Sequence, residues 1–285
     1  MPEEKLASRW LVSTDWSSQH LDDPHVIVLD SSYYLANAKR DAEAEYLTGH
    51  IPGAQRFDVD AISDHSNPLP HMLPSAEQFA RDVGALGVGD GMTVVLYDGL
   101  GLYGAARVWW TFRVFGAENV RVLDGGMPKW KVEGRPIEAG AAKPRAAKTF
   151  TPKFNRAMVA SIDDVQKVLL DKTAQVVDAR SAERFRAEAP EPRAGLRGGH
   201  MPGSFNVPFG EVLQNGRLKS HEEIAAAFRK AGVDLDKPAV TSCGSGVTAA
   251  ILTFAIEALD KQPGRVYDGS WAEWGARPDT PVVKG

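Results

Sequence analysis

Short apolar segments bounded by turn residues alternate along the chain with longer apolar segments. The short segments predict buried strands, and the longer ones, whose apolar positions follow a helical period, predict helices. The predicted strands are 26–30, 93–97, 120–123, 175–178, 239–242 and 265–267, and the clearest helices are 104–115 and 249–259. Because buried strands that alternate with helices form parallel sheets covered on both faces, we expect an α/β protein with mainly parallel sheets.

Two motifs occur once in each half of the chain. His50-Ile51-Pro52-Gly53 recurs as His200-Met201-Pro202-Gly203, and Asp124-Gly125-Gly126 recurs as Asp268-Gly269-Ser270. Such self-similarity predicts two homologous domains, which we place at residues 1–137 and 158–285. We regard the two histidines as markers of the fold, without a catalytic role.

The segment between the two predicted domains, 138–157, has a different composition. Much of it is Ala, Lys and Pro, and it lacks hydrophobic periodicity. Such a composition predicts a solvated linker that wraps one domain onto the other.

Cys243, the only cysteine, lies between the predicted strand 239–242 and the helix that follows. The amides of a turn and of a helix N-terminus stabilise an anion, and the thiolate is the reactive form of cysteine. Gly244 and Gly246 allow close approach of the backbone, and Ser245 and Thr248 add hydroxyl donors. We therefore interpret Cys243 as a nucleophile.

Other interpretations of this cysteine are weaker. A free cysteine after a buried strand is often a small core residue, but the Gly-Ser-Gly that follows is poor packing material. A cysteine-dependent phosphatase would carry an arginine at the position of Ala249, and no Gly-Lys-Ser/Thr closes a phosphate-binding loop here.

Composition narrows the classes of function. The chain has 285 residues, 43% of them hydrophobic and 25% charged, as expected for a globular protein. Its formal net charge of −4 gives no electrostatic reason to expect nucleic acid or membrane binding. We expect no signal peptide, no membrane-spanning segment and no internal disulfide, hence a cytoplasmic protein. The spacing of the seven histidines predicts no metal site.

The duplicated His-x-Pro-Gly pattern, with a cysteine loop in the second half alone, resembles the rhodanese superfamily. The loop Cys243–Thr248, Cys-Gly-Ser-Gly-Val-Thr, is similar to that of its 3-mercaptopyruvate sulfurtransferase branch. The thiosulfate-using branch typically carries Arg-Lys where this chain has Gly244-Ser245. The resemblance implies two tandem rhodanese-like domains. Alignment of the two halves puts Asp98 in the place of Cys243, so we expect the first domain to be inactive.

The resemblance also implies a reaction. Cys243 would take sulfur from 3-mercaptopyruvate as a persulfide, release pyruvate, and pass the sulfur to cyanide or to a thiol acceptor such as thioredoxin. No metal or organic cofactor is expected, and the protein is expected to be a monomer. Two alternatives stay open: a thiosulfate sulfurtransferase, and a persulfide carrier that docks a partner protein.

Individual site residues follow from the same resemblance. Arg184 and Arg193 would clamp the substrate carboxylate, because a guanidinium matches it with two parallel hydrogen bonds. Ser245, His71 and Asp60 would form a proton relay, in which Asp58 could replace Asp60. The remaining predicted substrate-binding residues are Gly244, Gly246, Val247, Thr248 and Tyr103.

Other arginines of the second half receive different roles. Arg180, close behind Asp178, is expected to be structural. Arg186 and Arg197 are expected to lie in a solvated basic loop.

Overall fold

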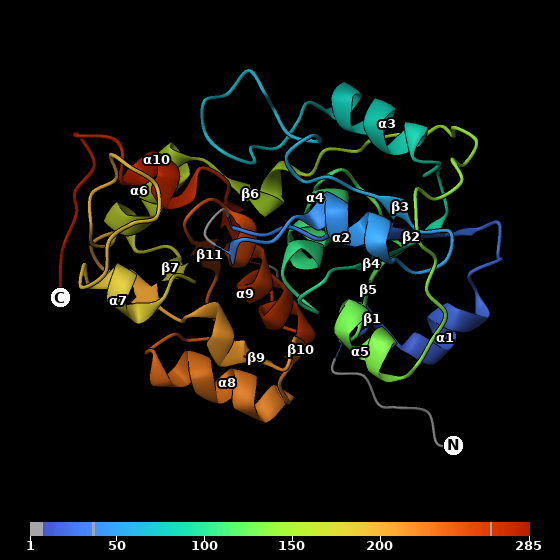
Figure 1. The fold of residues 1–285 in the computed structure, drawn as a ribbon. Helices are drawn as coiled ribbons and strands as arrows, with labels where there is room; N and C mark the ends of the chain where they lie inside the picture. The colour runs from blue at the N-terminus through green and yellow to red at the C-terminus, as the bar shows by residue number, and fades with distance from the viewer. Residues whose placement is uncertain (1–7, 36–37, 263) are drawn as a thin grey trace. The chain divides into compact units, whose positions relative to one another are not determined.

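The computed structural model describes residues 8–35, 38–262 and 264–285 (Figure 1), so the predicted absence of a signal peptide falls partly outside the described residues. The chain divides into two compact units. The first comprises residues up to 64, 73–155 and 215–217, and the second comprises 65–72, 156–214 and 218–285. The predicted boundaries at 137 and 158 stay a prediction.

Each unit contains one five-stranded sheet in which all neighbours are parallel. The first has the order β1 (Leu11–Val12), β5 (Val120–Leu123), β4 (Thr93–Tyr97), β2 (Val26–Asp30), β3 (Gln55–Arg56). The second has the order β6 (Val159–Ala160), β12 (Arg265–Tyr267), β11 (Ala239–Ser242), β7 (Gln175–Asp178), β8 (Phe205–Asn206). The predicted α/β fold is confirmed, and the strands that the sequence missed are pairs of residues at the sheet edges.

Helices follow the strands as the alternating pattern predicts. Those of the first unit are α1 (Thr14–Gln19), α2 (Ala42–Thr48), α3 (Ala76–Ala85), α4 (Gly104–Val114) and α5 (Gly126–Val132). Those of the second are η2 (Arg156–Met158), α6 (Ile162–Asp171), α7 (Ala182–Phe185), η3 (Phe209–Val212), α8 (His221–Lys230), α9 (Val247–Ala258) and α10 (Ser270–Trp274). β9 (Leu213–Gln214) and β10 (Arg217–Leu218) form a separate two-stranded sheet.

The central helix of each unit packs on the middle of its own sheet. Helix α4 contacts β4 and β5, and α9 contacts β11 and β12. All twelve residues of α9 are buried. The helix begins at Val247, two residues earlier than predicted, because Gly246 takes the left-handed conformation (φ +77°) and completes the turn before it.

The repeated histidines make the same contacts in both units. His50 stacks on Tyr46 with ring centroids 4.1 Å apart, and His200 stacks on Phe185 at 3.7 Å. In each case Nδ1 lies 2.9 Å from the carbonyl oxygen of the stacked residue. The histidines therefore tie the helix before each Pro-Gly turn to the turn itself.

The segment predicted as a solvated linker packs against the first unit as far as Asn155. Lys148 N–H donates to the carbonyl of Gly84 at 3.0 Å, and Thr151 donates to Asp90 through its amide and its hydroxyl. Phe150 is 9% exposed and meets the ring of Phe79 edge to face, 5.6 Å between centroids. Ala142 and Phe150 are buried and anchor the segment to the first unit, while most of its other residues are exposed, as the composition predicts.

Replacement of Phe150 by Ala tests whether the segment is part of the first unit's core. We expect Phe150→Ala to lower the free energy of unfolding by about 3 kcal/mol, because a buried ring is lost and a cavity is left. Denaturant titration measures the change. Phe154→Ala is the matched control, since Phe154 lies in the same segment and is 51% exposed. Its loss should stay below about 1 kcal/mol, and equal losses would contradict the packing described here.

Candidate active site

Cys243 stands directly after the central strand β11 of the second unit. It is 2% exposed and its thiol is free. Its amide N–H donates to Ser270 Oγ at 3.2 Å, and its carbonyl accepts from Trp271 N–H at 2.9 Å. Both main-chain groups are thereby fixed, so the direction of the Cα–Cβ bond is fixed as well.

Several backbone N–H groups of the turn after Cys243 are available as hydrogen-bond donors. Gly246, at the N-cap of α9, provides no side-chain cap for the helix. Within the described part of the chain, the N–H groups of Gly244, Ser245, Val247 and Thr248 have no hydrogen-bond acceptor. A turn and a helix N-terminus with available N–H groups form a site for an anion beside the sulfur.

A buried ion-pair chain lies next to this turn. Arg180 is bound through Nε and Nη2 to Asp178, and its Nη1 donates to Glu191 Oε1 at 2.7 Å. The other oxygen of Glu191, Oε2, accepts from Arg184 Nη2 at 2.5 Å. The side chains of Arg180 and Glu191 are 0% and 1% exposed, and that of Arg184 is 21% exposed. Arg184 is thus the member of the chain that reaches solvent.

Both predicted clamp residues converge on Gly244. A Cβ atom built on Gly244 would lie 3.1 Å from Arg184 Nη2 and 3.9 Å from Arg193 Nη1. The absence of a side chain at this position leaves space for the guanidinium of Arg184. Two cations therefore lie beside the turn that carries Cys243.

Arg193 links two further predicted residues. Its Nη2 donates to Ser245 Oγ at 3.3 Å and lies 3.4 Å from His71 Nε2. Because a guanidinium only donates, Nε2 accepts in this arrangement, and a neutral His71 carries its proton on Nδ1. His71 is 8% exposed and is held at φ +60°. By its contacts it belongs to the second unit, so Cys243, Ser245, Arg184, Arg193 and His71 lie in one unit.

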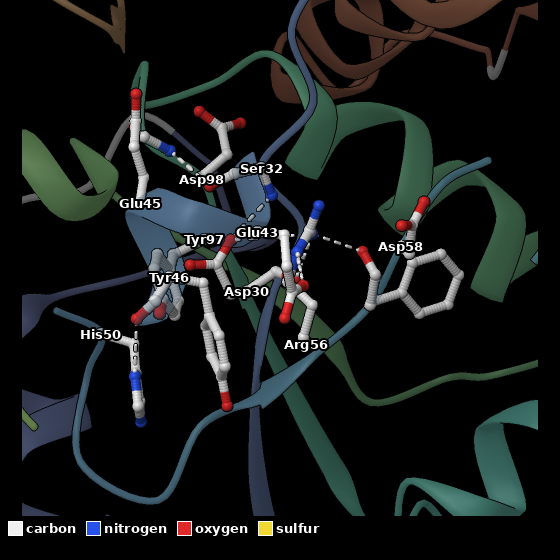
Figure 2. A network of polar contacts seen from close by, with 12 residues as sticks. Asp30, Ser32, Glu43, Glu45, Tyr46, His50, Arg56, Asp58, Tyr97 and Asp98 are labelled. Carbon is white, nitrogen blue, oxygen red and sulfur yellow. Dashed lines mark hydrogen bonds and ion pairs between the residues drawn. The ribbon is translucent and has the colours of Figure 1, made fainter. Parts of the chain in front are cut away.

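The first unit has an equivalent turn, organised around Asp98, whose side chain is labelled in Figure 2. Asp98 follows β4 as Cys243 follows β11, and its carbonyl accepts from Met127 N–H at 3.0 Å, as that of Cys243 accepts from Trp271. Its carboxylate accepts four backbone N–H bonds of 2.6–2.9 Å. The donors are Leu100, Gly101, Tyr103 and Ala105. Burial raises the pKa of Asp98, and these donors oppose the rise.

The surroundings of Asp98 also differ from those of Cys243. Glu45 precedes the stacked Tyr46 as Arg184 precedes Phe185, so a carboxylate replaces the guanidinium. Glu45 is paired with Arg40, and Arg40 also lies 3.9 Å from the ring centroid of Tyr34. The first unit therefore lacks the thiol, but a guanidinium lies beside its turn as well: Arg40 Nη2 would be 3.2 Å from a Cβ atom built on Gly99.

Two predicted site residues, Asp60 and Tyr103, belong to the first unit. The amide of Asp60 donates to Asp58 Oδ1 at 2.8 Å, and its carbonyl accepts from Ser63. Tyr103 is 8% exposed, and its ring is parallel to that of Tyr33, with centroids 6.5 Å apart. Their roles at the Cys243 site stay predictions.

The other arginines divide between structural and exposed positions. Arg180 is buried in the ion-pair chain, in agreement with its expected structural role. Arg186 pairs with Glu188 at the surface. The prediction for Arg197 is wrong: its guanidinium donates to the carbonyls of Trp274, Gly275 and Thr280, so it holds the chain after α10.

Glu191 was missed by sequence reasoning. Its neighbours Pro190 and Pro192 were a usable signal, because a residue before proline is held in an extended conformation.

Among the described residues, no group of three or more His, Cys, Asp and Glu side chains could hold a metal ion. In the same part of the chain, no helix has both the length and the apolar character that crossing a membrane requires.

Comparison with known proteins identifies the family. The model of the rhodanese-like domain matches twice, at residues 13–133 and 161–277. The chain belongs to the rhodanese family. It is 44% identical to the 3-mercaptopyruvate sulfurtransferase of Escherichia coli, over 97% of this chain and 99% of that protein.

Two further relatives extend the comparison. The mitochondrial thiosulfate/3-mercaptopyruvate sulfurtransferase 1 of Arabidopsis thaliana is 43% identical, over 95% of this chain and 77% of that protein. The crystal structure of the rhodanese-fold protein SseA from Escherichia coli superposes with a TM-score of 0.85 at 42% identity, covering 92% of this chain and 98% of that one.

Removal of the Asp98 carboxylate tests whether it organises the turn of the first rhodanese domain. We expect Asp98→Ala to lower the free energy of unfolding by at least about 3 kcal/mol, since four buried N–H groups lose their acceptor. Asp58→Ala is the control, because Asp58 accepts two backbone N–H bonds at a less buried position. A loss no larger than the control's, measured by denaturant titration, would show that the carboxylate is dispensable.

Proposed function

We propose that this chain transfers sulfur from 3-mercaptopyruvate to a thiol or to cyanide through a persulfide on Cys243. The observation that carries the proposal is one thiol at an amide-lined turn, with the guanidiniums of Arg184 and Arg193 converging on Gly244. The 3-mercaptopyruvate sulfurtransferases named above support the choice of donor, since they match along almost the whole chain.

The first half-reaction forms the persulfide. The Cys243 thiolate attacks the sulfur of 3-mercaptopyruvate, a sulfur–sulfur bond forms and the carbon–sulfur bond breaks. Its electron pair goes to the methylene carbon, which the adjacent ketone stabilises as the enolate of pyruvate. The proton of the substrate thiol ends on that carbon, so the products are pyruvate and the Cys243 persulfide anion.

The second half-reaction regenerates the thiolate. Cyanide or an acceptor thiolate attacks the outer sulfur, the sulfur–sulfur bond breaks, and the electron pair returns to Cys243. The product is thiocyanate or the acceptor's persulfide. A thiol protein such as thioredoxin is our proposed protein acceptor.

Arg184 and Arg193 bind the carboxylate and ketone of the substrate in this mechanism. A guanidinium offers parallel N–H donors that match a carboxylate, and the low exposure of this cluster strengthens each contact. The free turn amides of Gly244 and Val247, together with Ser245 and Thr248, stabilise the charge on sulfur. Tyr103 and Gly246 complete our proposed substrate-binding set.

Ser245 and His71 move the proton. The Nε2 atom of His71 is the acceptor in the present arrangement, so it is ready to take a proton that arrives through Ser245 or from the substrate thiol. Arg193 now occupies the space between Ser245 and His71. Binding of the substrate carboxylate would draw this guanidinium away from the pair. Asp60 is our proposed orienting carboxylate for His71.

The first domain takes no part in covalent chemistry in this proposal. Asp98 fills with its own carboxylate the place where the second domain carries the thiol of Cys243. A fixed anion there excludes both a nucleophile and an anionic substrate.

Thiosulfate is the alternative donor, because relatives in Arabidopsis thaliana are named for both donors. A persulfide carrier that delivers sulfur to a docked protein is the alternative from another class. It would load Cys243 and release sulfur only to its partner.

Replacement of Cys243 by Ser tests the nucleophile. With 3-mercaptopyruvate, intact-mass spectrometry should detect one added sulfur atom on the wild type and none on Cys243→Ser. Pyruvate release should fall by at least about 1,000-fold, since a hydroxyl is a far weaker nucleophile than a thiolate.

Parallel assays with thiosulfate separate the alternatives. Faster turnover of thiosulfate would identify it as the donor. A persulfide that forms without turnover to cyanide or small thiols would indicate a carrier. Sulfur loading or pyruvate release that persists in Cys243→Ser would contradict the assignment.

Removal of one clamp charge tests substrate binding. We expect Arg193→Gln to lower kcat/KM for 3-mercaptopyruvate by about 30- to 150-fold, because a charge-assisted contact contributes about 2–3 kcal/mol. Arg186→Gln is the matched control from the same segment, where the guanidinium is exposed and paired with Glu188. Equal kinetics of the two variants would remove Arg193 from the clamp.

A further inference from the structure

Glu191 is the one carboxylate of the active-site cluster whose charge is shared between a structural and a substrate-facing arginine. Its oxygens are divided, with Oε1 on Arg180 and Oε2 on Arg184. At 1% exposure its side chain has no solvent to compete for those bonds. Nothing in the proposed reaction requires a second carboxylate at this place, so its function has to be sought in what it does to Arg184.

The first consequence is geometric. Arg180 is immobilised by Asp178, by the carbonyl of Gly199 and by the face of Trp271, which lies 4.1 Å from its guanidinium carbon. Glu191 is therefore held in place by a rigid group, and its ion pair with Arg184 fixes the position of Arg184 in turn. A long side chain such as Arg184 otherwise loses rotamer freedom when it is ordered by substrate.

The second consequence is electrostatic. The ion-pair chain contains the guanidiniums of Arg180 and Arg184 and the carboxylates of Asp178 and Glu191, and Arg193 lies beside the same Gly244, so these five side chains carry a formal net charge of +1. With the charge on sulfur stabilised by the turn amides, they offer one positive charge to the donor. 3-Mercaptopyruvate carries one negative charge, on its carboxylate, whereas thiosulfate carries two.

We propose that Glu191 is a positioning and donor-specificity residue: it fixes Arg184 against the Cys243 turn and sets the charge of the cluster to favour a monoanionic donor over a dianionic one. The inference rests on the proposed function. It goes beyond it by giving the buried carboxylate control over which donor is used.

Glu191→Gln separates the two consequences. The amide keeps the size of the side chain but removes the charge, so the cluster becomes +2 and Arg184 loses its ion pair. We expect kcat/KM for 3-mercaptopyruvate to fall about tenfold, mainly through KM. The ratio of kcat/KM for thiosulfate to that for 3-mercaptopyruvate should rise about tenfold, because an added cation within several ångströms favours the donor with the extra charge.

Glu191→Asp is the second variant. It keeps the charge but is one methylene shorter, so Arg184 is held less well. We expect a loss in kcat/KM for both donors with a donor ratio within about twofold of the wild type. Glu188→Gln is the matched control, since Glu188 is in the same segment, is 55% exposed and pairs with Arg186. It should change neither quantity.

The donor ratio is measured on one preparation, so the fraction of active protein cancels. Thiosulfate serves as donor or, where turnover is too slow, as competitive inhibitor of 3-mercaptopyruvate. If Glu191→Gln does not fold, Glu191→Asp still tests positioning through its KM. An unchanged ratio in Glu191→Gln, or an unchanged KM in Glu191→Asp, would overturn the proposal. Failure of the wild type to form a persulfide from 3-mercaptopyruvate would instead overturn the proposed function.

Discussion

A turn of backbone N–H groups at the end of the central strand, arranged to stabilise a negative charge, is the feature on which both halves of the molecule depend. In the first half that charge is the carboxylate of Asp98, with four N–H donors around it. In the second half the same place holds Cys243, and the turn amides are left with donors to spare. The two turns have similar backbones and differ mainly in the side chain at their start, Asp98 or Cys243. The first turn therefore shows that such a backbone stabilises an anion. In the proposed reaction a thiolate, and then a persulfide, takes the place of that carboxylate.

Charged side chains lie beside both turns. In the first half Glu45 is tied to Arg40, whose Nη2 would lie 3.2 Å from a Cβ atom built on Gly99. Where the anion is a reacting sulfur, Arg184 and Arg193 face Gly244. The two domains thus contain one turn whose N–H groups are occupied by a carboxylate and one whose N–H groups are available beside a thiol. The buried chain from Asp178 to Glu191 supplies the rigidity that the second arrangement requires.

Much of this could be predicted from sequence because it depends on local pattern. The buried strands β2 and β4 are nearly continuous apolar segments, and β7 and β11 each contain two adjacent apolar residues. The glycines that follow Cys243 draw attention to it. The rest depends on tertiary contacts. Phe150 anchors a loop of linker-like composition in the core. Arg197 binds backbone carbonyls, and no sequence pattern predicts such partners. Glu191 is an isolated acidic residue between two prolines. Its ion pairs with Arg180 and Arg184 are known only from the structure.

The most direct test of the account is a single-turnover experiment with 3-mercaptopyruvate labelled with heavy sulfur. After rapid quenching, peptide mapping should locate the label on Cys243, at a rate equal to pyruvate release, and a thiol acceptor should then remove it. Label that reaches the acceptor without passing through Cys243, or pyruvate that forms faster than Cys243 is loaded, would contradict the account.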